Sequence, residues 1–151
     1  MGEPNPPTPR GKSRQPPPDS PDTSGGSGSK DRPESPLDFA RDVLGVHLWS
    51  KQEEVLSALP DHRRVAVKSG NGLGKGFCVA VAVLWFLHIH GPHEPAIVLS
   101  TAPTFRQVRH ILWGQTRRLH RPAAGILGGK MLDARWELAD DRYAMGLSAD
   151  G

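Results

Sequence analysis

The stretch RVAVKSGNGLGKGFCVAVAVLWFLHI, residues 64–89, decides how the rest of the chain can fold. Its first five residues, 64–68, form a short β-branched run that predicts a buried strand. A glycine-rich turn follows at residues 69–76. The apolar run at 77–89 predicts a buried helix, because it is longer than the usual strand of about 5–6 residues. A strand, a glycine-rich turn ending in Gly-Lys and a helix together form the context of a phosphate-binding P-loop.

The glycine-rich turn has the chemistry that a phosphate group requires. Its glycines allow successive main-chain amides to point at phosphate oxygens, and Lys75 adds a full positive charge where the helix begins. Two positions depart from the P-loop pattern: Ser69 stands at the first glycine, and Gly76 replaces the hydroxyl residue that holds Mg²⁺. The alternative is an ordinary glycine-rich β–α turn. We expect phosphate contacts from Ser69, Gly70, Asn71, Gly72, Leu73, Gly74, Lys75 and Gly76.

A second unit of the same kind follows along the chain. Residues 96–100 predict another buried strand, and Thr104 with Gln107 forms a Thr-x-x-Gln capping box that starts a helix over residues 105–121. Two strands that are each followed by a helix predict a parallel βαβ sheet with flanking helices, and therefore an α/β fold. Ligands of such sheets gather at the carboxyl ends of the strands, which would bring Lys75 close to residues 101–104.

The segment ahead of this fold has a different composition. Residues 1–34 are rich in Pro, Gly and Ser and contain no Val, Ile, Leu, Phe, Tyr or Trp. They cannot bury enough apolar area to offset their ordering entropy, so we predict a disordered arm over 1–34 and one domain over 35–151. Ser35 predicts the start of a first helix that Gly45 can close. Ser50 and Glu53 predict a capping box for a second helix, which Pro60 stops.

Composition narrows the class of protein. Cys78 is the only cysteine among 151 residues, which excludes an intramolecular disulfide and fits a reducing compartment. The longest apolar run, 77–87, has 11 residues, fewer than the roughly 18 that cross a bilayer. We therefore expect a soluble cytoplasmic protein with no membrane partner. The formal net charge of +3 permits a polyanion partner without arguing for one.

The helix predicted over 105–121 carries a basic face. It contains five arginines and no acidic residue. Apolar residues outline the opposite, inward stripe: Val108, Ile111, Leu112 and Leu119, with Gln115. A solvated basic face is the more common meaning of such a pattern, and contact with the backbone of DNA is the functional one. The candidate DNA contacts are Arg106, Arg109, Arg117, Arg118 and Arg121.

Other chemistry-bearing residues have simpler explanations. Asp140 and Asp141 lie between two alternating runs, 135–139 and 142–146, which predict a β-hairpin rather than a pair of catalytic carboxylates. His88, His90 and His93 straddle a helix end and a Gly-Pro turn, so we expect exposed histidines and no metal site. The four tryptophans are expected to be core or half-buried packing residues. The catalytic residues stay unidentified.

Taken in order, these motifs resemble the beginning of a bacteriophage terminase large subunit, the ATPase that drives DNA into capsids. The resemblance spans roughly residues 39–148 and rests on LGVHLWSKQEEVL (44–56), SGNGLGKG (69–76), AIVLSTAPTFRQV (96–108) and YAMGLS (143–148). It implies a RecA-like P-loop NTPase fold, ATP and Mg²⁺ as ligands, and the cytoplasm of a bacterial host. The implied partners are double-stranded DNA, the portal or capsid, and the small terminase subunit.

The resemblance also implies roles for individual residues. A glutamine ahead of the P-loop reads adenine in that family, and Gln52 matches it; the alternative is a solvated residue in the first turn of a helix. The motif that couples nucleotide state to DNA follows the second strand, and its counterparts here are Thr101, Ala102, Pro103 and Thr104.

Some parts of the family's pattern have no counterpart in these 151 residues. The apolar strand ending in Asp-Glu, which holds Mg²⁺ and activates water, is absent, and so is the nuclease domain. The chain thus resembles the N-terminal part of the ATPase domain alone, from a truncated gene, a decaying prophage gene or one part of a split gene. We expect at most weak nucleotide binding and no appreciable ATP hydrolysis. Another P-loop enzyme, such as a helicase or small kinase, and a non-catalytic DNA- or capsid-binding adaptor stay open as alternatives.

Overall fold

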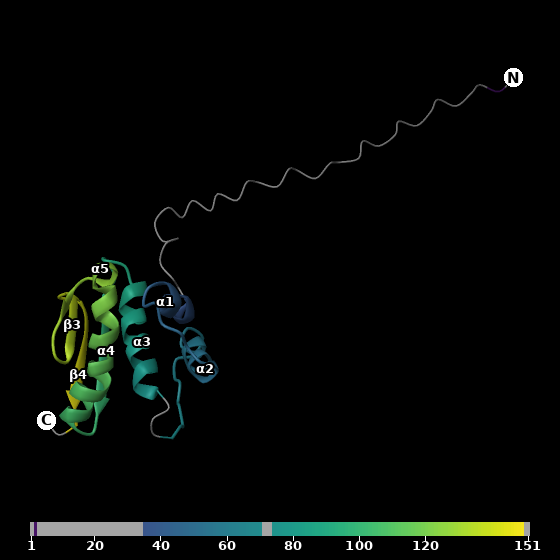
Figure 1. Cartoon of the computed structure of the whole chain (residues 1–151). Coiled ribbons are helices and arrows are strands. Elements are labelled where there is room, and N and C mark those ends of the chain that lie inside the picture. The colour runs from purple at the N-terminus through teal and green to yellow at the C-terminus, as the bar shows by residue number, and fades with distance from the viewer. Residues whose placement is uncertain (1, 3–34, 71–73, 150–151) are drawn as a thin grey trace.

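The computed structural model describes residue 2, residues 35–70 and residues 74–149 (Figure 1). The arm predicted over 1–34 lies outside these residues, so its prediction stays open. In chain order the elements are α1 (Pro36–Asp42), α2 (Ser50–Ala58), α3 (Lys75–Ile89), β1 (Ala96–Ala102), η1 (Gln107–Leu112), α4 (Trp113–His120), η2 (Arg121–Ala123), α5 (Ala124–Leu127), β2 (Lys130–Met131), β3 (Arg135–Ala139) and β4 (Arg142–Ser148). The α/β class is confirmed.

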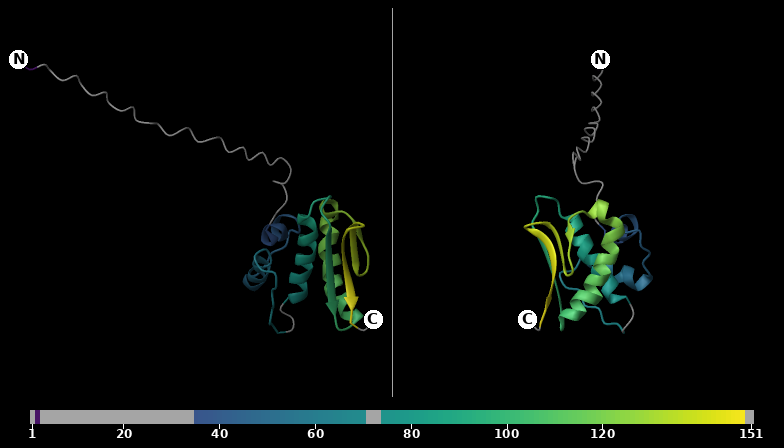
Figure 2. Two further views of the ribbon diagram at one scale, coloured as in Figure 1. Left: turned by 180° about the vertical axis from the view of Figure 1, so that it is seen from behind. Right: turned by 60° about the vertical axis from the view of Figure 1, so that its left-hand side comes forward.

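The four strands form one mixed sheet in the order β1-β4-β3-β2. β1 pairs with β4 in parallel, from Ala96 opposite Arg142 to Ala102 opposite Ser148. β3 pairs antiparallel with both β4 and β2. The predicted hairpin around residues 140–141 is confirmed, and so is the strand that begins at residue 96. The helices lie on one side of the sheet, with α4 and α3 next to it and α1 and α2 beyond them (Figures 1 and 2).

Two buried tryptophans fix the sheet against the helices. Trp113 is 1% exposed, and its indole Nε1 donates to the Ser100 hydroxyl at 3.0 Å. Trp136 is fully buried and donates from Nε1 to the Gly128 carbonyl at 3.0 Å. Both polar indole atoms are therefore satisfied inside an apolar core, as buried tryptophans require. The side chains of α3 that complete this core are Ala80, Val81, Val83, Leu84, Trp85 and Leu87.

Most helix boundaries follow from local chemistry. Ser35 caps α1 by accepting the Leu37 N–H at 3.2 Å, as predicted. Gly45, at φ +64°, closes that helix in the left-handed region that favours glycine. The Thr104–Gln107 capping box is confirmed.

The second capping box differs from its prediction. The Trp49 N–H donates to Oε1 of Gln52 at 3.2 Å, so the bond back to the N-cap lies one residue earlier than in the expected pair of Ser50 and Glu53, and the Trp49 side chain makes no capping bond in return. Ser50 is the first residue of α2 rather than its cap. The apolar side chain of Leu56 explains this register, because it is fully buried in the core and fixes which face of α2 turns inward.

The strand predicted over 64–68 is wrong. These residues belong to no helix or strand, and Val67 is 44% exposed. The predicted parallel βαβ unit between 64–68 and residues 96–100 is therefore absent from the described residues, and β4 is the parallel partner of β1. A β-branched run forms a strand only where a neighbouring strand accepts its hydrogen bonds. No described strand lies against 64–68, so the run stays extended without a ladder.

The helix predicted over 105–121 forms, but with a different inward face. Residues 107–112 have π-helical hydrogen bonding, and the helical path then continues to Leu127. Val108 is fully buried as expected, whereas Ile111 is 59% exposed. The wider π turn shifts the phase of the side chains by part of a turn, which is why a stripe drawn on regular α-helical spacing misplaced Ile111.

Candidate nucleotide site

Helix α3 begins at the end of the glycine-rich turn. Gly74 is its N-cap, with φ +74°, and Lys75 is its first residue, two residues before the predicted start. A non-glycine residue at this φ would be strained, so the glycine is required by the turn itself. The first amides of a helix have no intrahelical partner, and the helix dipole makes this end positive. These two properties favour an anion at the start of α3.

Lys75 holds the two ends of the turn together. Its Nζ donates to the main-chain carbonyl of Ser69 at 2.9 Å, and the side chain is exposed. Ser69 and Gly70 are the residues that enter the turn. Asn71, Gly72 and Leu73, which were also predicted to contact phosphate, lie outside the described residues. Among the described residues of the turn, one neutral acceptor therefore holds the Lys75 ammonium group, and a phosphate oxygen could replace it.

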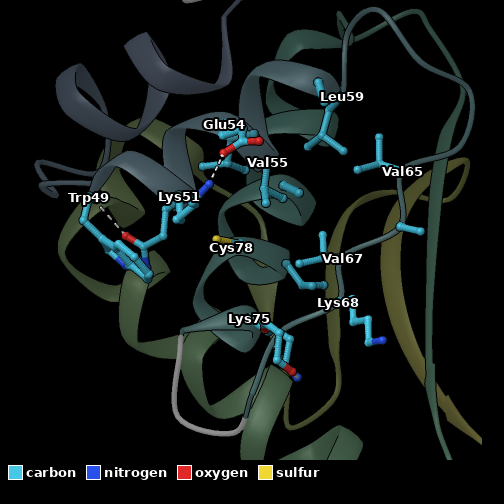
Figure 3. Close-up of a pocket in the computed structure, with 17 residues that line it drawn as sticks. Trp49, Lys51, Glu54, Val55, Leu59, Val65, Val67, Lys68, Lys75 and Cys78 are labelled. Atoms are coloured by element: carbon cyan, nitrogen blue, oxygen red, sulfur yellow. Dashed lines mark hydrogen bonds and ion pairs between the residues drawn. The ribbon is translucent and has the colours of Figure 1, made fainter.

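A cavity of about 940 Å³ opens beside this lysine. It lies between α2, the extended residues 65–69 and the first turns of α3 (Figure 3). The polar groups lining it come from Lys51, Gln52, Glu54, Lys68, Ser69 and Lys75, and the apolar ones include Trp49, Val55, Leu59, Val65, Val67 and Cys78. A pocket of this size with few polar groups has the character of a small-molecule site.

Gln52 lies against the glycine-rich turn. The side chain is 8% exposed, so the interpretation of this residue as a solvated one is wrong. A Cβ added at Gly74 would stand 2.7 Å from Gln52 Nε2, which shows how closely the amide approaches the turn. Its Oε1 already accepts the Trp49 N–H. Gln52 thus bonds through Oε1 to the residue that precedes α2, while its Nε2 lies close to Gly74 at the start of α3.

Trp49 is a site residue that the sequence did not single out. It was expected to be a core or half-buried packing residue; it is 44% exposed and lines the cavity with Gln52 and Lys75 (Figure 3). Aromatic faces exposed at a polar cavity can stack on the flat ring of a base. The available signal was its place three residues ahead of Gln52, which is the spacing of one helical turn.

The described residues do not fit Mg²⁺. Gly76 offers no oxygen ligand in its side chain, and Glu54, the carboxylate that lines the cavity, is held by Lys51 at 2.9 Å. Over residues 35–70 and 74–149, no group of three or more His, Cys, Asp or Glu side chains could hold a metal ion. Mg²⁺ binds through several oxygen ligands in near-octahedral geometry.

The residues at the end of β1 and just after it, 101–104, lie near Lys75 only in part. Thr101 lines a second cavity together with Lys75 and Gly76, as expected for the carboxyl end of a strand. Thr104 instead accepts the Gln107 N–H at 3.3 Å and so starts the next helix. Ala102 ends β1, and Pro103 follows it in the connection. Of this group, Thr101 alone lies with Lys75 along that cavity.

The five arginines predicted to contact DNA do not form one free face. Asp133, from the connection between β2 and β3, accepts an ion pair from Arg109 at 2.6 Å, and Arg117 donates to its main-chain carbonyl. These two arginines therefore hold the helix to the hairpin. Arg106, Arg118 and Arg121 have exposed side chains.

Cys78 lies on α3 and lines the cavity, but its side chain is buried. Burial raises the pKa of the Cys78 thiol, because the thiolate would lose its hydration. A thiol with a raised pKa is a weak nucleophile at neutral pH. This agrees with its interpretation as a small packing residue.

Comparisons with protein-family models, with curated proteins and with solved structures found no match. Among the described helices, none is long and apolar enough to span a membrane.

Proposed function

We propose that this chain is the nucleotide-binding N-terminal part of a terminase-type, ATP-driven DNA-packaging motor with an incomplete RecA-like P-loop fold. The observation that carries the proposal is the start of α3. There, Gly74 in the left-handed region and the Lys75 ammonium stand at the mouth of a cavity that Gln52 and Trp49 also line. A polyphosphate tail at this end would meet the helix dipole and a full positive charge.

Different residues of the chain would bind different parts of the nucleotide. Lys75 would exchange the Ser69 carbonyl for a phosphate oxygen, a stronger, charge-assisted partner. Trp49 would offer its exposed face to the base. Gln52 would contact adenine through Nε2, since its Oε1 is engaged by the Trp49 N–H.

We propose further that the chain binds ATP without hydrolysing it. The cavity offers no oxygen ligand set for Mg²⁺, and its carboxylate, Glu54, is paired with Lys51. Phosphoryl transfer in P-loop enzymes depends on a bound metal ion and on a residue that positions the attacking water. The described part of the chain supplies neither group at the cavity.

Calorimetric titration of the full chain with ATP and with ADP tests the proposal. Lys75→Ala should weaken binding of both nucleotides about tenfold or more, because a charge-assisted hydrogen bond to phosphate is lost. Lys130→Ala removes the same charge from an exposed position on β2 and should leave affinity unchanged. Equal affinities of the native chain and Lys75→Ala would refute the site.

Hydrolysis is measured separately with radiolabelled ATP. We expect no release of phosphate above the level of buffer alone. Turnover that disappears in Lys75→Ala would disprove the non-hydrolytic part of the proposal while supporting the site.

The non-catalytic adaptor has one observation in its favour, the exposed arginines Arg106, Arg118 and Arg121. Duplex DNA binding that weakens with salt and is unaffected by Lys75→Ala would support it. Binding lost in a triple Ala variant at these positions would assign the contact.

A further inference from the structure

The edge of the sheet formed by β1 is unpaired in the described residues. β1 stands at one end of the strand order and pairs only with β4. Ile97 and Leu99 on this strand are 51% and 58% exposed. An edge strand of this kind presents a row of free main-chain donors and acceptors, which another extended chain can satisfy.

A groove runs beside this edge. It is a cavity of about 670 Å³ that adjoins the one at Gln52 and shares Leu59, Lys75, Val79 and Ala82 with it. Its floor is α3, through Val79, Ala82, Val83 and Phe86, one wall is β1 at residues 97–101, and the opposite wall is formed by Leu59, His62 and Arg63. Val79 on the floor is 45% exposed. The groove is thus apolar along its length and bounded on both sides.

The charged groups at the groove have one sign. Arg63 and Lys75 line it, and none of its lining residues is acidic. Neither basic residue has an acidic partner among the described ion pairs. An occupant that combines apolar residues with acidic ends would complement both features.

The parts of this chain outside the described residues do not provide such an occupant. Residues 1–34 contain no Val, Ile, Leu, Phe, Tyr or Trp, and the segments 71–73 and 150–151 are too short to form a strand. A second copy would bring the edge of its own sheet with β4 attached to β1. Leu59, His62 and Arg63 line the groove together with α3 and β1, and this enclosure favours a single chain over a sheet edge.

We propose that this groove binds one extended segment of a partner polypeptide, which is apolar and carries acidic residues, and which joins the sheet as a strand beside β1. Main-chain hydrogen bonds to β1 would supply the pairing. Side chains of the added strand that turn toward α3 would meet Val79, and those on the opposite face would meet Ile97 and Leu99, which supplies the selectivity for apolar side chains. The proposal does not rest on nucleotide binding.

The test uses the full chain and a short synthetic peptide in which Val and Thr alternate between Glu residues at both ends. The control peptide has the same composition, except that Pro replaces one central Val and removes a ladder donor. We expect the first peptide to bind and to slow amide exchange over 97–101, and the Pro peptide to bind about tenfold more weakly or not at all.

Two variants locate the contact. Leu99→Asp places a charge on the β1 edge and should weaken peptide binding about tenfold or more. Leu147→Asp makes the same change at an exposed apolar residue of β4, opposite Thr101 and outside the groove, and should bind like the native chain. Circular dichroism confirms that both variants are folded.

Three outcomes would overturn the proposal. The first is no saturable binding of the Val-Thr peptide, and the second is equal affinity in Leu99→Asp. The third is a dimer of the native chain in sedimentation that dissociates in Leu99→Asp, which would assign the edge to a second copy. Because the measurements contain no nucleotide, their failure leaves the ATP titrations standing.

Discussion

Helix α3 separates two regions that differ in how completely they are packed. On one side, η1, α4 and the sheet bury Val108, Trp113 and Trp136 almost completely. On the other side, the connection 59–70 leaves two cavities against the same helix. Both regions contain short β-branched runs, yet only those of the first region form strands. The comparison shows that a β-branched run is not enough to form a strand. It also needs a neighbouring strand and side chains that become buried against it.

The largest expected change in the free energy of unfolding comes from truncating a side chain in the packed region, compared with truncating one in the open region. Trp136→Ala should lower the free energy of unfolding by about 3–5 kcal/mol, because a fully buried ring and its hydrogen bond to Gly128 are lost. Val67→Ala, at a 44% exposed position of the open region, should change it by no more than about 0.5 kcal/mol. Urea denaturation followed by circular dichroism measures both. Similar costs would mean that residues 64–68 are packed as firmly as the hairpin.

An intermediate effect is expected at the boundary between the regions. Gly74→Ala should cost about 1–2 kcal/mol from its positive φ alone, and the new Cβ would also press on Gln52 Nε2 at 2.7 Å. Gly76→Ala is the matched control: its Cβ would meet only Ile111 at an ordinary 3.6 Å, and it should stabilise α3 by about 0.5–1 kcal/mol.

A double variant separates the two costs at Gly74. Adding Gln52→Ala removes the amide that the new Cβ meets but leaves the strained φ, so part of the cost of Gly74→Ala should disappear. Strictly additive free energies of unfolding would show that Gln52 does not press on the turn.

The smallest expected effect is a change of stability with pH that arises from Cys78, which lies between the core and the open cavity. Since burial raises its pKa, the folded chain holds the thiol proton more tightly than the unfolded chain. The contribution of this thiol to the free energy of unfolding is therefore fully present below the ordinary thiol pKa. It is lost as the pH rises through the raised pKa of the folded chain. Alkylation by iodoacetamide at neutral pH should be much slower than in the urea-unfolded chain. Equal rates would place the thiol in open solvent.

The sequence predicted those parts of the fold that depend on local chemistry. The Ser35 cap, the Gly45 closure, the Thr104–Gln107 box and the turn at 140–141 each depend on groups within a few residues, and all are confirmed. The strand at 64–68 and the partner of β1 depend on residues far along the chain, and the exposure of Ile111 depends on the π turn at residues 107–112. Regular strand or α-helical spacing carries no information on these features, and all three predictions were wrong.

The features of the candidate site likewise fall into those that a contiguous motif predicts and those that depend on tertiary packing. The glycine-rich turn and Lys75 could be recognised from a contiguous motif. The burial of Gln52 and the exposure of Trp49 depend on how α2 packs against α3, which no local pattern specifies. The ion pair between Arg109 and Asp133 joins residues 24 positions apart, so it was likewise invisible in the spacing of the arginines.

The hydrogen bond between Lys75 and the Ser69 carbonyl competes with any anion for the ammonium group. Any anion arriving at α3 must first displace a main-chain carbonyl from the ammonium group, at a cost of about 1.5–3 kcal/mol for a hydrogen bond to a charged donor. Weakly basic anions cannot recover that cost with a single contact. A ligand that contacts both the Lys75 ammonium and the first amides of α3 therefore binds more favourably than a ligand that contacts the ammonium alone.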